Sequence, residues 1–231
     1  MINIMAGGGS TLTLPTLIFL GLDSSMANGT NRVAIFIQNI SAIASFRKEN
    51  HSEFGLSWKL GLLTLPGAVI GAFVATEISN ETFKSILAVI MIGVVISMLL
   101  PKSKKKFSEK VFEKLPWAIY PAMILIGFYG GFIQVGVGFL LMAALHYIMK
   151  MNLVFVNMHK VAIVFLYTIP ALLIFIFTNN IDWFYGLSLA AGNALGGWWA
   201  AKWAVRKGEK FIRYFLVVVV IGMSLKLLNI F

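Results

Sequence analysis

The chain has 231 residues, of which 59% are hydrophobic and only 12% charged, whereas soluble domains average about 45–50% and about 25%. Such a chain cannot cover a water-facing surface with polar side chains, which excludes an ordinary soluble enzyme, a disordered tail and a secreted scaffold. The net charge of +10 fits the cytoplasmic loops of a membrane protein better than a nucleic-acid partner. Because cysteine is absent, disulfides and thiolate metal ligands are also excluded.

Apolar stretches long enough to enter a bilayer core of about 30 Å follow one another along the chain. The sequence therefore predicts an all-α polytopic bundle of about eight apolar segments in the cell membrane. In chain order these segments are Met5–Gly21, Val33–Phe46, Leu56–Thr76, Thr82–Leu100, Pro116–Ile148, Val154–Thr178, Trp183–Trp203 and Phe211–Ile230. The fifth is too long for one span and is interrupted by glycines, so we predict two half-spans within it.

Lysine and arginine orient the segments, because cytoplasmic loops carry an excess of them. Residues 101–115 include six lysines against two glutamates and are predicted to form a basic cytoplasmic loop. Working outward from this loop, the stretches Glu77–Glu81 and Asn179–Asp182 are predicted to face the outside. Lys150 and the basic stretch Lys202–Lys210 are predicted to face the inside.

The two halves of the sequence resemble each other. AGGG at 6–9 matches VGVG at 135–138, and TNRVAI at 30–35 matches MHKVAI at 158–163. Corresponding loops differ in charge, which predicts two repeats of inverted topology, a common construction in secondary transporters. The predicted division is residues 1–100, the loop 101–115, and residues 116–231. The alternative is a duplication that gave two parallel bundles with no role in transport.

Two glycine-rich stretches, MAGGGSTLTLP and GGFIQVGVG, are each predicted to break a span into half-helices. The N-terminus of a half-helix offers free N–H groups and the positive end of a dipole, which attract anions. Glycine also lets the backbone approach a ligand closely. The alternative is that these glycines only allow close helix packing. The residues predicted to cradle an anion are Gly7, Gly8, Gly9, Ser10, Thr11, Gly136 and Gly138.

Two polar pairs, Asn31-Arg32 and His159-Lys160, occupy equivalent places in the two halves. Ionisable groups within spans are costly and usually mark ion pathways, so we expect these pairs to balance the charge of a bound anion. Gln134 is expected to hydrogen-bond it, and His159 is a candidate for coupling transport to protons. The alternatives are cations that snorkel at the membrane edge, a packed histidine, and a glutamine that bonds another helix.

Enzymatic chemistry finds no support in the sequence. It has no HExxH, P-loop or GxSxG motif, and the few acids lie almost wholly in predicted loops, so we expect no catalytic residue, metal or cofactor. The sequence instead predicts a secondary transporter of a small anion that works by alternating access. A passive anion channel and a membrane scaffold subunit without transport are the alternatives.

Four motifs carry a resemblance that covers nearly the whole chain. GGGSTLTLP followed by TNR, GFYGGFIQVGVG followed by HK, PGAVIGAFVA and GNALGGWWAA resemble the sulfite exporter TauE/SafE family. The resemblance implies a bacterial cytoplasmic-membrane protein that exports sulfite, sulfoacetate or related sulfur-containing anions, without identifying which. Family members usually carry a further apolar stretch before the first glycine motif. Nothing equivalent precedes Met5, so either this half-span is absent or the start codon was placed late.

Overall fold

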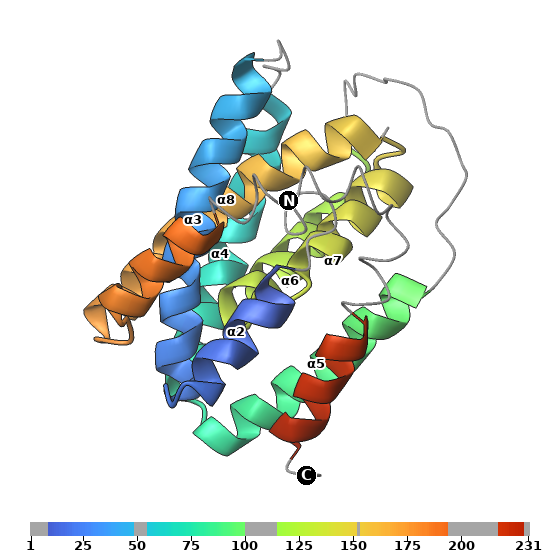
Figure 1. Ribbon diagram of the computed structural model, residues 1–231. Coiled ribbons are helices and arrows are strands. Elements are labelled where there is room, and N and C mark those ends of the chain that lie inside the picture. The colour runs from blue at the N-terminus through green and yellow to red at the C-terminus, as the bar shows by residue number, and fades with distance from the viewer. Residues whose placement is uncertain (1–8, 49–54, 100–114, 152, 194–216, 229–231) are drawn as a thin grey trace.

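The computed structural model describes residues 9–48, 55–99, 115–151, 153–193 and 217–228. Within these ranges the chain forms helices joined by short turns, and no strand occurs among them (Figure 1), as the composition predicted. Most of the predicted basic loop and the basic stretch after Lys202 lie outside the described residues. The helices are α2 (Ser10–Phe19), α3 (Ser24–Lys48), α4 (Gly55–Glu77), α5 (Asn80–Leu99), α6 (Ile119–Phe132), α7 (Val137–Ala143), the π-helical η1 (Ala144–Ile148) and α8 (Leu153–Phe177), followed by helices at 183–193 and Val217–Leu227.

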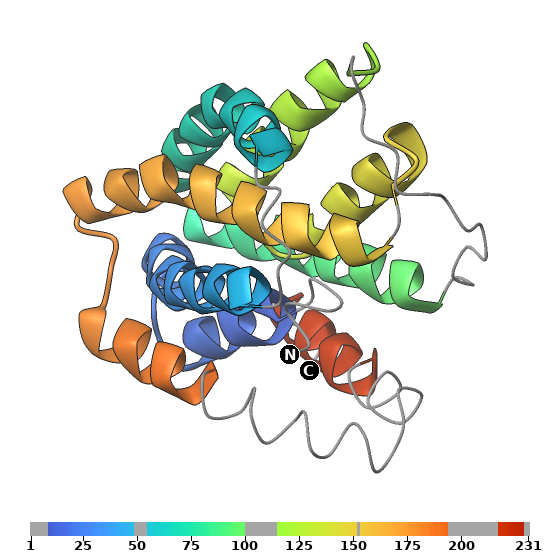
Figure 2. The same ribbon diagram turned by 90° about the horizontal axis from the view of Figure 1, so that it is seen from above.

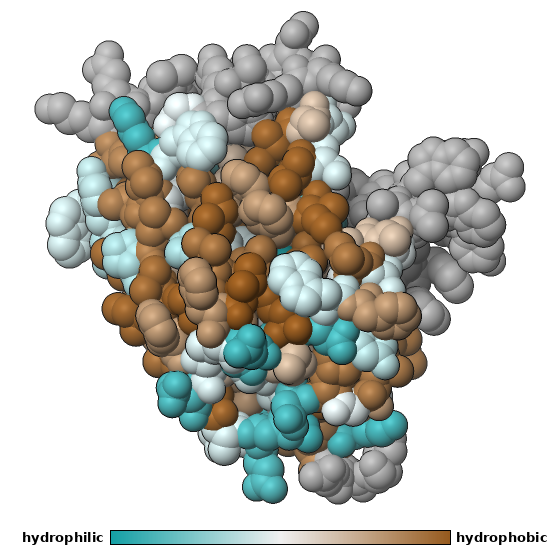
Figure 3. Space-filling model, turned by 90° about the vertical axis from the view of Figure 1, so that its left-hand side faces the viewer, coloured by the Kyte–Doolittle hydropathy of each residue, from teal (hydrophilic) through white to brown (hydrophobic). Residues whose placement is uncertain are grey.

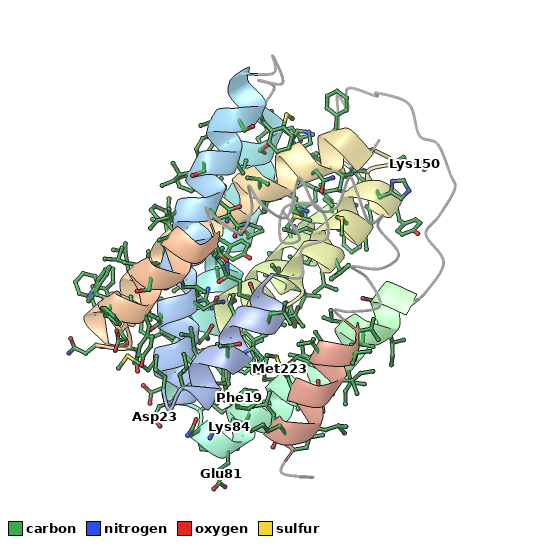
Figure 4. All side chains as sticks on the ribbon, viewed as in Figure 1. Phe19, Asp23, Glu81, Lys84, Lys150 and Met223 are labelled. Carbon is green, nitrogen blue, oxygen red and sulfur yellow. The ribbon has the colours of Figure 1, made fainter. Side chains whose placement is uncertain are left out.

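The bundle has two polar ends. Asp23, Glu81 and Lys84 lie at one of them, which we call the acidic end, and Lys150 lies at the other, which we call the opposite end (Figure 4). The loop-charge argument predicts that the acidic end faces the outside of the cell.

Between these ends, the surface is suited to a lipid environment. Figure 3 shows apolar side chains over the middle of one face and hydrophilic ones gathered at its lower end. Along α4, the large side chains of Leu62, Ile70 and Phe73 are each more than half exposed. Exposed apolar surface on this scale is typical of side chains that contact lipid tails. Among the described residues, α4, α5 and α8 contain stretches that are long and apolar enough to cross a membrane.

Helix α3 is as long as α8, with 25 residues in each, although its first third is polar. The sequence predicted that this apolar segment starts at Val33, whereas the helix begins at Ser24. The reason is that Asn28, Thr30 and Arg32 are fully buried. These side chains face protein instead of lipid, so they can be helical at membrane depth provided that they find partners inside.

Helices α4 and α6 pack closely against each other through glycines. A Cβ atom placed on Gly67 would lie 2.6 Å from the backbone nitrogen of Phe128, and one on Gly71 would lie 2.8 Å from that of Phe132. Small residues at such a contact let two helix backbones approach, which is common in membrane proteins. The pairing advances in the same direction along both helices, so α4 and α6 run parallel.

Helix α8 lies between α3 and α4 (Figure 2). Phe36 stacks on Phe165 with ring centroids 5.2 Å apart, while Gly29, nearer the start of α3, touches Phe175 near the end of α8. The two helices therefore run in opposite directions. Since they carry the matched motifs TNRVAI and MHKVAI, this arrangement agrees with an inverted repeat.

The long apolar stretch 116–148 is broken as predicted. Helix α6 ends at Phe132 and α7 begins at Val137. Because α6 runs parallel to α4, it descends from the opposite end toward the acidic end, and α7 with η1 then returns toward the opposite end (Figure 1). The two half-helices thus form a re-entrant hairpin whose tip, residues 133–136, lies inside the bundle.

Candidate functional site

Two helices begin in the interior of the bundle and point in opposite directions. Helix α2 begins at Ser10 and runs toward the acidic end, while the continuous apolar helix Val137–Ile148 runs toward the opposite end (Figure 1). The first N–H groups of a helix have no helical acceptor, and the dipole makes its N-terminus favourable for negative charge. The glycine-rich stretches therefore bring two helix N-termini into the protein interior.

A small, partly open cavity lies where these helices begin. Its polar lining comes from Ser10, Gln38, Asn39, Gln134 and Lys160, and its apolar lining from Ile35, Val137, Gly138, Val161 and Val164. The sequence analysis predicted Ser10, Gln134, Gly138 and Lys160 as site residues, and the structure brings these four together.

Lys160 is the charged residue among the described side chains that line this cavity. It is only 2% exposed, and its Nζ donates a hydrogen bond to Asn157 Oδ1 at 2.8 Å. A lysine buried to this extent does not snorkel at the membrane edge. Lys160 lines the same cavity as Ser10 and Gly138, at the starts of the two interior helices, so the lining combines a cationic side chain with helix N-termini.

Gln134 sits at the tip of the re-entrant hairpin. Its backbone has a φ of 59°, a left-handed conformation that few residues other than glycine adopt. Its Nε2 approaches the hydroxyl of Thr168 at 3.4 Å, and its buried Oε1 has no hydrogen-bond partner among the described residues. The hydroxyl of Tyr129 donates to the carbonyl of Val135 and thereby ties the break to α6.

Arg32 is fully buried but does not line the cavity. Its Nη1 donates to the carbonyl of Gly130 at 3.0 Å, and its Nη2 donates to the carbonyl of Gly131. These carbonyls belong to the last turn of α6, where the helix leaves them unpaired. Arg32 therefore caps the negative end of α6, and it does not converge with Lys160 on one pocket.

Asn28, which the sequence analysis did not single out, completes this cap. Its Nδ2 donates to the carbonyl of Phe132 at 2.7 Å, and its Oδ1 lies 3.5 Å from Arg32 Nη2. The ring of Phe175 covers the guanidinium, with Cζ 4.9 Å from the ring centroid. Asn28 lies four residues before Arg32, a spacing that places both on one helix face and was the available sequence signal.

Asn31 and His159 also bond other helices. The hydroxyl of Thr13 donates to Asn31 Oδ1 at 2.6 Å, which ties α2 to α3. Nδ1 of His159 pairs with the Ser57 hydroxyl at 2.7 Å, which ties α8 to α4. Both side chains are buried, and neither is among the residues that line the cavity.

The remaining predicted site residues are glycines and one threonine. Gly7 and Gly8 lie outside the described residues, and Gly9 directly precedes α2. Thr11 is buried beside the start of α2, and its hydroxyl has no hydrogen-bond partner among the described residues. Gly136 has a φ of 74°, a left-handed backbone conformation, so the break between α6 and α7 favours a residue without a side chain at this position.

An interior cavity in a lipid-facing helix bundle with oppositely directed half-helices is an arrangement typical of multi-pass membrane transporters. The comparison with known families agrees: residues 1–227 match the family described as "Sulfite exporter TauE/SafE". The chain belongs to this family, and it is therefore a membrane transporter and not an enzyme.

Curated relatives carry the same general description. The chain is 27% identical over 228 residues to the "Probable membrane transporter protein ORF9" of Sinorhizobium sp., covering 98% of this chain and 87% of that protein. It is 25% identical to a similarly named protein of Haemophilus influenzae, covering 98% and 89%. It is 28% identical to YfcA of Escherichia coli K12, covering 98% and 84%. No solved structure matches the chain.

Proposed function

We propose that this transporter exports a small anion, sulfite or an organosulfur anion, from the cytoplasm by alternating access. The observation that carries the proposal is the cavity, in which buried Lys160 lies beside the starts of two oppositely directed helices. Positive charge from an ammonium group and from helix N-termini favours an anion. The family description names sulfite, and that name is the basis for the proposed chemical class.

Different residues are proposed to recognise different parts of the anion. Lys160 would balance its charge, while the hydroxyl of Ser10, the amide of Gln134 and the backbone at Gly138 would hydrogen-bond its oxygens. The apolar part of the cavity lining is compatible with the short carbon chain of an organosulfur anion. Gly7 and Gly8 remain predicted members of this site.

The role of the other predicted residues is narrower. Arg32, Asn31 and His159 are engaged with other helices, so we assign them to the framework around the cavity. Nδ1 of His159 is already paired with the Ser57 hydroxyl. Proton coupling through His159 remains a prediction.

Lys160→Met tests the proposal in proteoliposomes loaded with labelled sulfite or a short alkanesulfonate. Losing a charge-assisted hydrogen bond of about 1.5–3 kcal/mol should weaken anion binding by about tenfold or more, and Lys160→Arg should retain part of the flux. Lys84→Met is the matched control, because it removes a lysine at the acidic end away from the cavity. Equal flux in Lys160→Met and Lys84→Met would remove Lys160 from the site.

The mechanism is tested with the unchanged protein. Anion supplied on the far side of the membrane should accelerate labelled uptake, and uptake should saturate. Flux that rises linearly without such acceleration would identify a passive channel. Absence of flux for every anion, together with stable copurification of a partner protein, would identify a scaffold subunit.

A further inference from the structure

The cavity and the cap around Arg32 lie at different depths along the same helices. On α3, the cavity-lining residues begin at Ile35, about 16 Å along the helix from Ser24 at the acidic end. Asn28 and Arg32 occupy the interval between them. On α8, the lining residues end at Val164, and Phe175 lies further toward the acidic end. The cap therefore stands between the cavity and the acidic end.

The side chains of this intervening layer are closely packed. The side chains of Asn28, Arg32 and Phe175 are fully buried, and Phe132 is 9% exposed. Phe132 packs against Phe83 of α5 with ring centroids 5.9 Å apart. The layer thus joins α3, α5, α6 and α8 between the cavity and the acidic end.

Hydrogen bonds hold this layer together, and hydrogen bonds can be exchanged for bonds to other partners. Arg32 and its acceptors Gly130 and Gly131 are separated by nearly a hundred residues of chain, so the cap connects two helices that are distant in sequence, α3 and α6. Its Nε, although buried, has no hydrogen-bond partner among the described residues. A guanidinium that is only partly satisfied loses less on release than a fully bonded one.

We propose that Arg32 is a positioning residue that acts as a latch: by holding the carbonyl end of α6 it closes the cavity toward the acidic end, and its release opens that side. This proposal rests on the proposed alternating-access function. It replaces direct anion binding by Arg32 with control of access. Asn28 and Phe175 assist by holding the Phe132 carbonyl and covering the guanidinium.

The natural absence of cysteine makes access to the cavity measurable. A single cysteine is placed at Val164, which lines the cavity and is 8% exposed. A membrane-impermeant cationic methanethiosulfonate is then applied from the acidic end of oriented vesicles. In the Val164→Cys chain labelling should be slow, and adding Arg32→Gln should accelerate it at least tenfold. Lys84→Gln, the matched control, removes one positive charge at the acidic end and should leave the rate unchanged.

Several variants separate the latch from a general loss of structure. Asn28→Ala removes the bond to the Phe132 carbonyl and the 3.5 Å contact with Arg32 Nη2, but leaves the Arg32 bonds to Gly130 and Gly131. It should give a smaller acceleration in a chain that elutes as a single species. Arg32→Lys supplies one point charge in place of the planar fork and should label at an intermediate rate. If Arg32→Gln fails to fold, the Asn28→Ala and Arg32→Lys rates decide the question.

The result also distinguishes this proposal from the proposed function, because labelling needs no anion flux. Unchanged labelling in all three variants would overturn the latch, even if the unchanged protein transports sulfite. Unchanged labelling with a raised KM in Arg32→Gln would show that Arg32 binds the anion instead. Accelerated labelling in a protein without any flux would support the barrier and refute the transport proposal.

Discussion

The contact between α4 and α6 allows a sharp test of helix packing, in the variant Gly67→Ala. The new Cβ would lie 2.6 Å from the backbone nitrogen of Phe128, and closer still to the carbonyl oxygen of Ile124. Ordinary van der Waals contact begins at 3.4 Å, so α6 would have to retreat by at least about 0.8 Å. Both opposing atoms are backbone, so no side chain can rotate away to relieve the clash.

Overpacking of this kind costs about 1–3 kcal/mol, and the better helix propensity of alanine offsets about 1 kcal/mol at most. Because two rigid atoms oppose the methyl group, we expect a net loss of about 2 kcal/mol. For a chain of this size that corresponds to a fall in Tm of about 4–8 °C. The assay is thermal unfolding in detergent, followed by tryptophan fluorescence.

Gly93→Ala is the matched control, because a Cβ on Gly93 of α5 meets nothing within 4 Å. It should leave Tm unchanged or raise it slightly. The double variant Gly67→Ala with Gly131→Ala should lose less than the sum of the single losses, since the first methyl group already separates the two helices. A Gly67→Ala protein that unfolds at the same temperature as Gly93→Ala would refute the close-contact reasoning.

Two further substitutions test single hydrogen bonds. Thr30→Val removes the hydroxyl that accepts the backbone N–H of Asp182 at 2.9 Å, and it should lower the free energy of unfolding by about 1 kcal/mol. Thr16→Val, on the exposed side of α2, is the control and should lower it less. Equal Tm values for the two variants would contradict this prediction. Tyr129→Phe removes the hydrogen bond to the Val135 carbonyl. Hydrogen exchange of the backbone amides at the tip of the re-entrant hairpin should then become about fivefold faster. Unchanged exchange would show that this bond does not stabilise the break between α6 and α7.

The sequence allowed prediction of the helical class and of the interruption near Gly136, because glycine and apolar periodicity are local signals. It also pointed to buried polar pairs, since a cation inside an apolar run is costly wherever it lies. These features depend on the residue itself or on its near neighbours in the chain.

The partners of the buried cations could not be predicted. Arg32 binds the carbonyls of Gly130 and Gly131, and a backbone carbonyl has the same chemistry in every residue, so it leaves no mark in the sequence. The early start of α3 was missed for a related reason. Hydropathy treats Asn28 as a loop residue, whereas its side chain is bonded inside the bundle to a helix end far along the chain.

The two equivalent cations lie in different surroundings. A guanidinium is planar and presents a fork of donors, which matches two successive carbonyls of a helix end, whereas an ammonium group is a compact point charge. Arg32 bonds two carbonyls away from the cavity, and Lys160 lines it. A fixed acceptor of defined geometry suits arginine, and a mobile anion of variable orientation suits lysine. The choice of residue at each equivalent position therefore fits the proposed division between a latch at Arg32 and a binding site at Lys160.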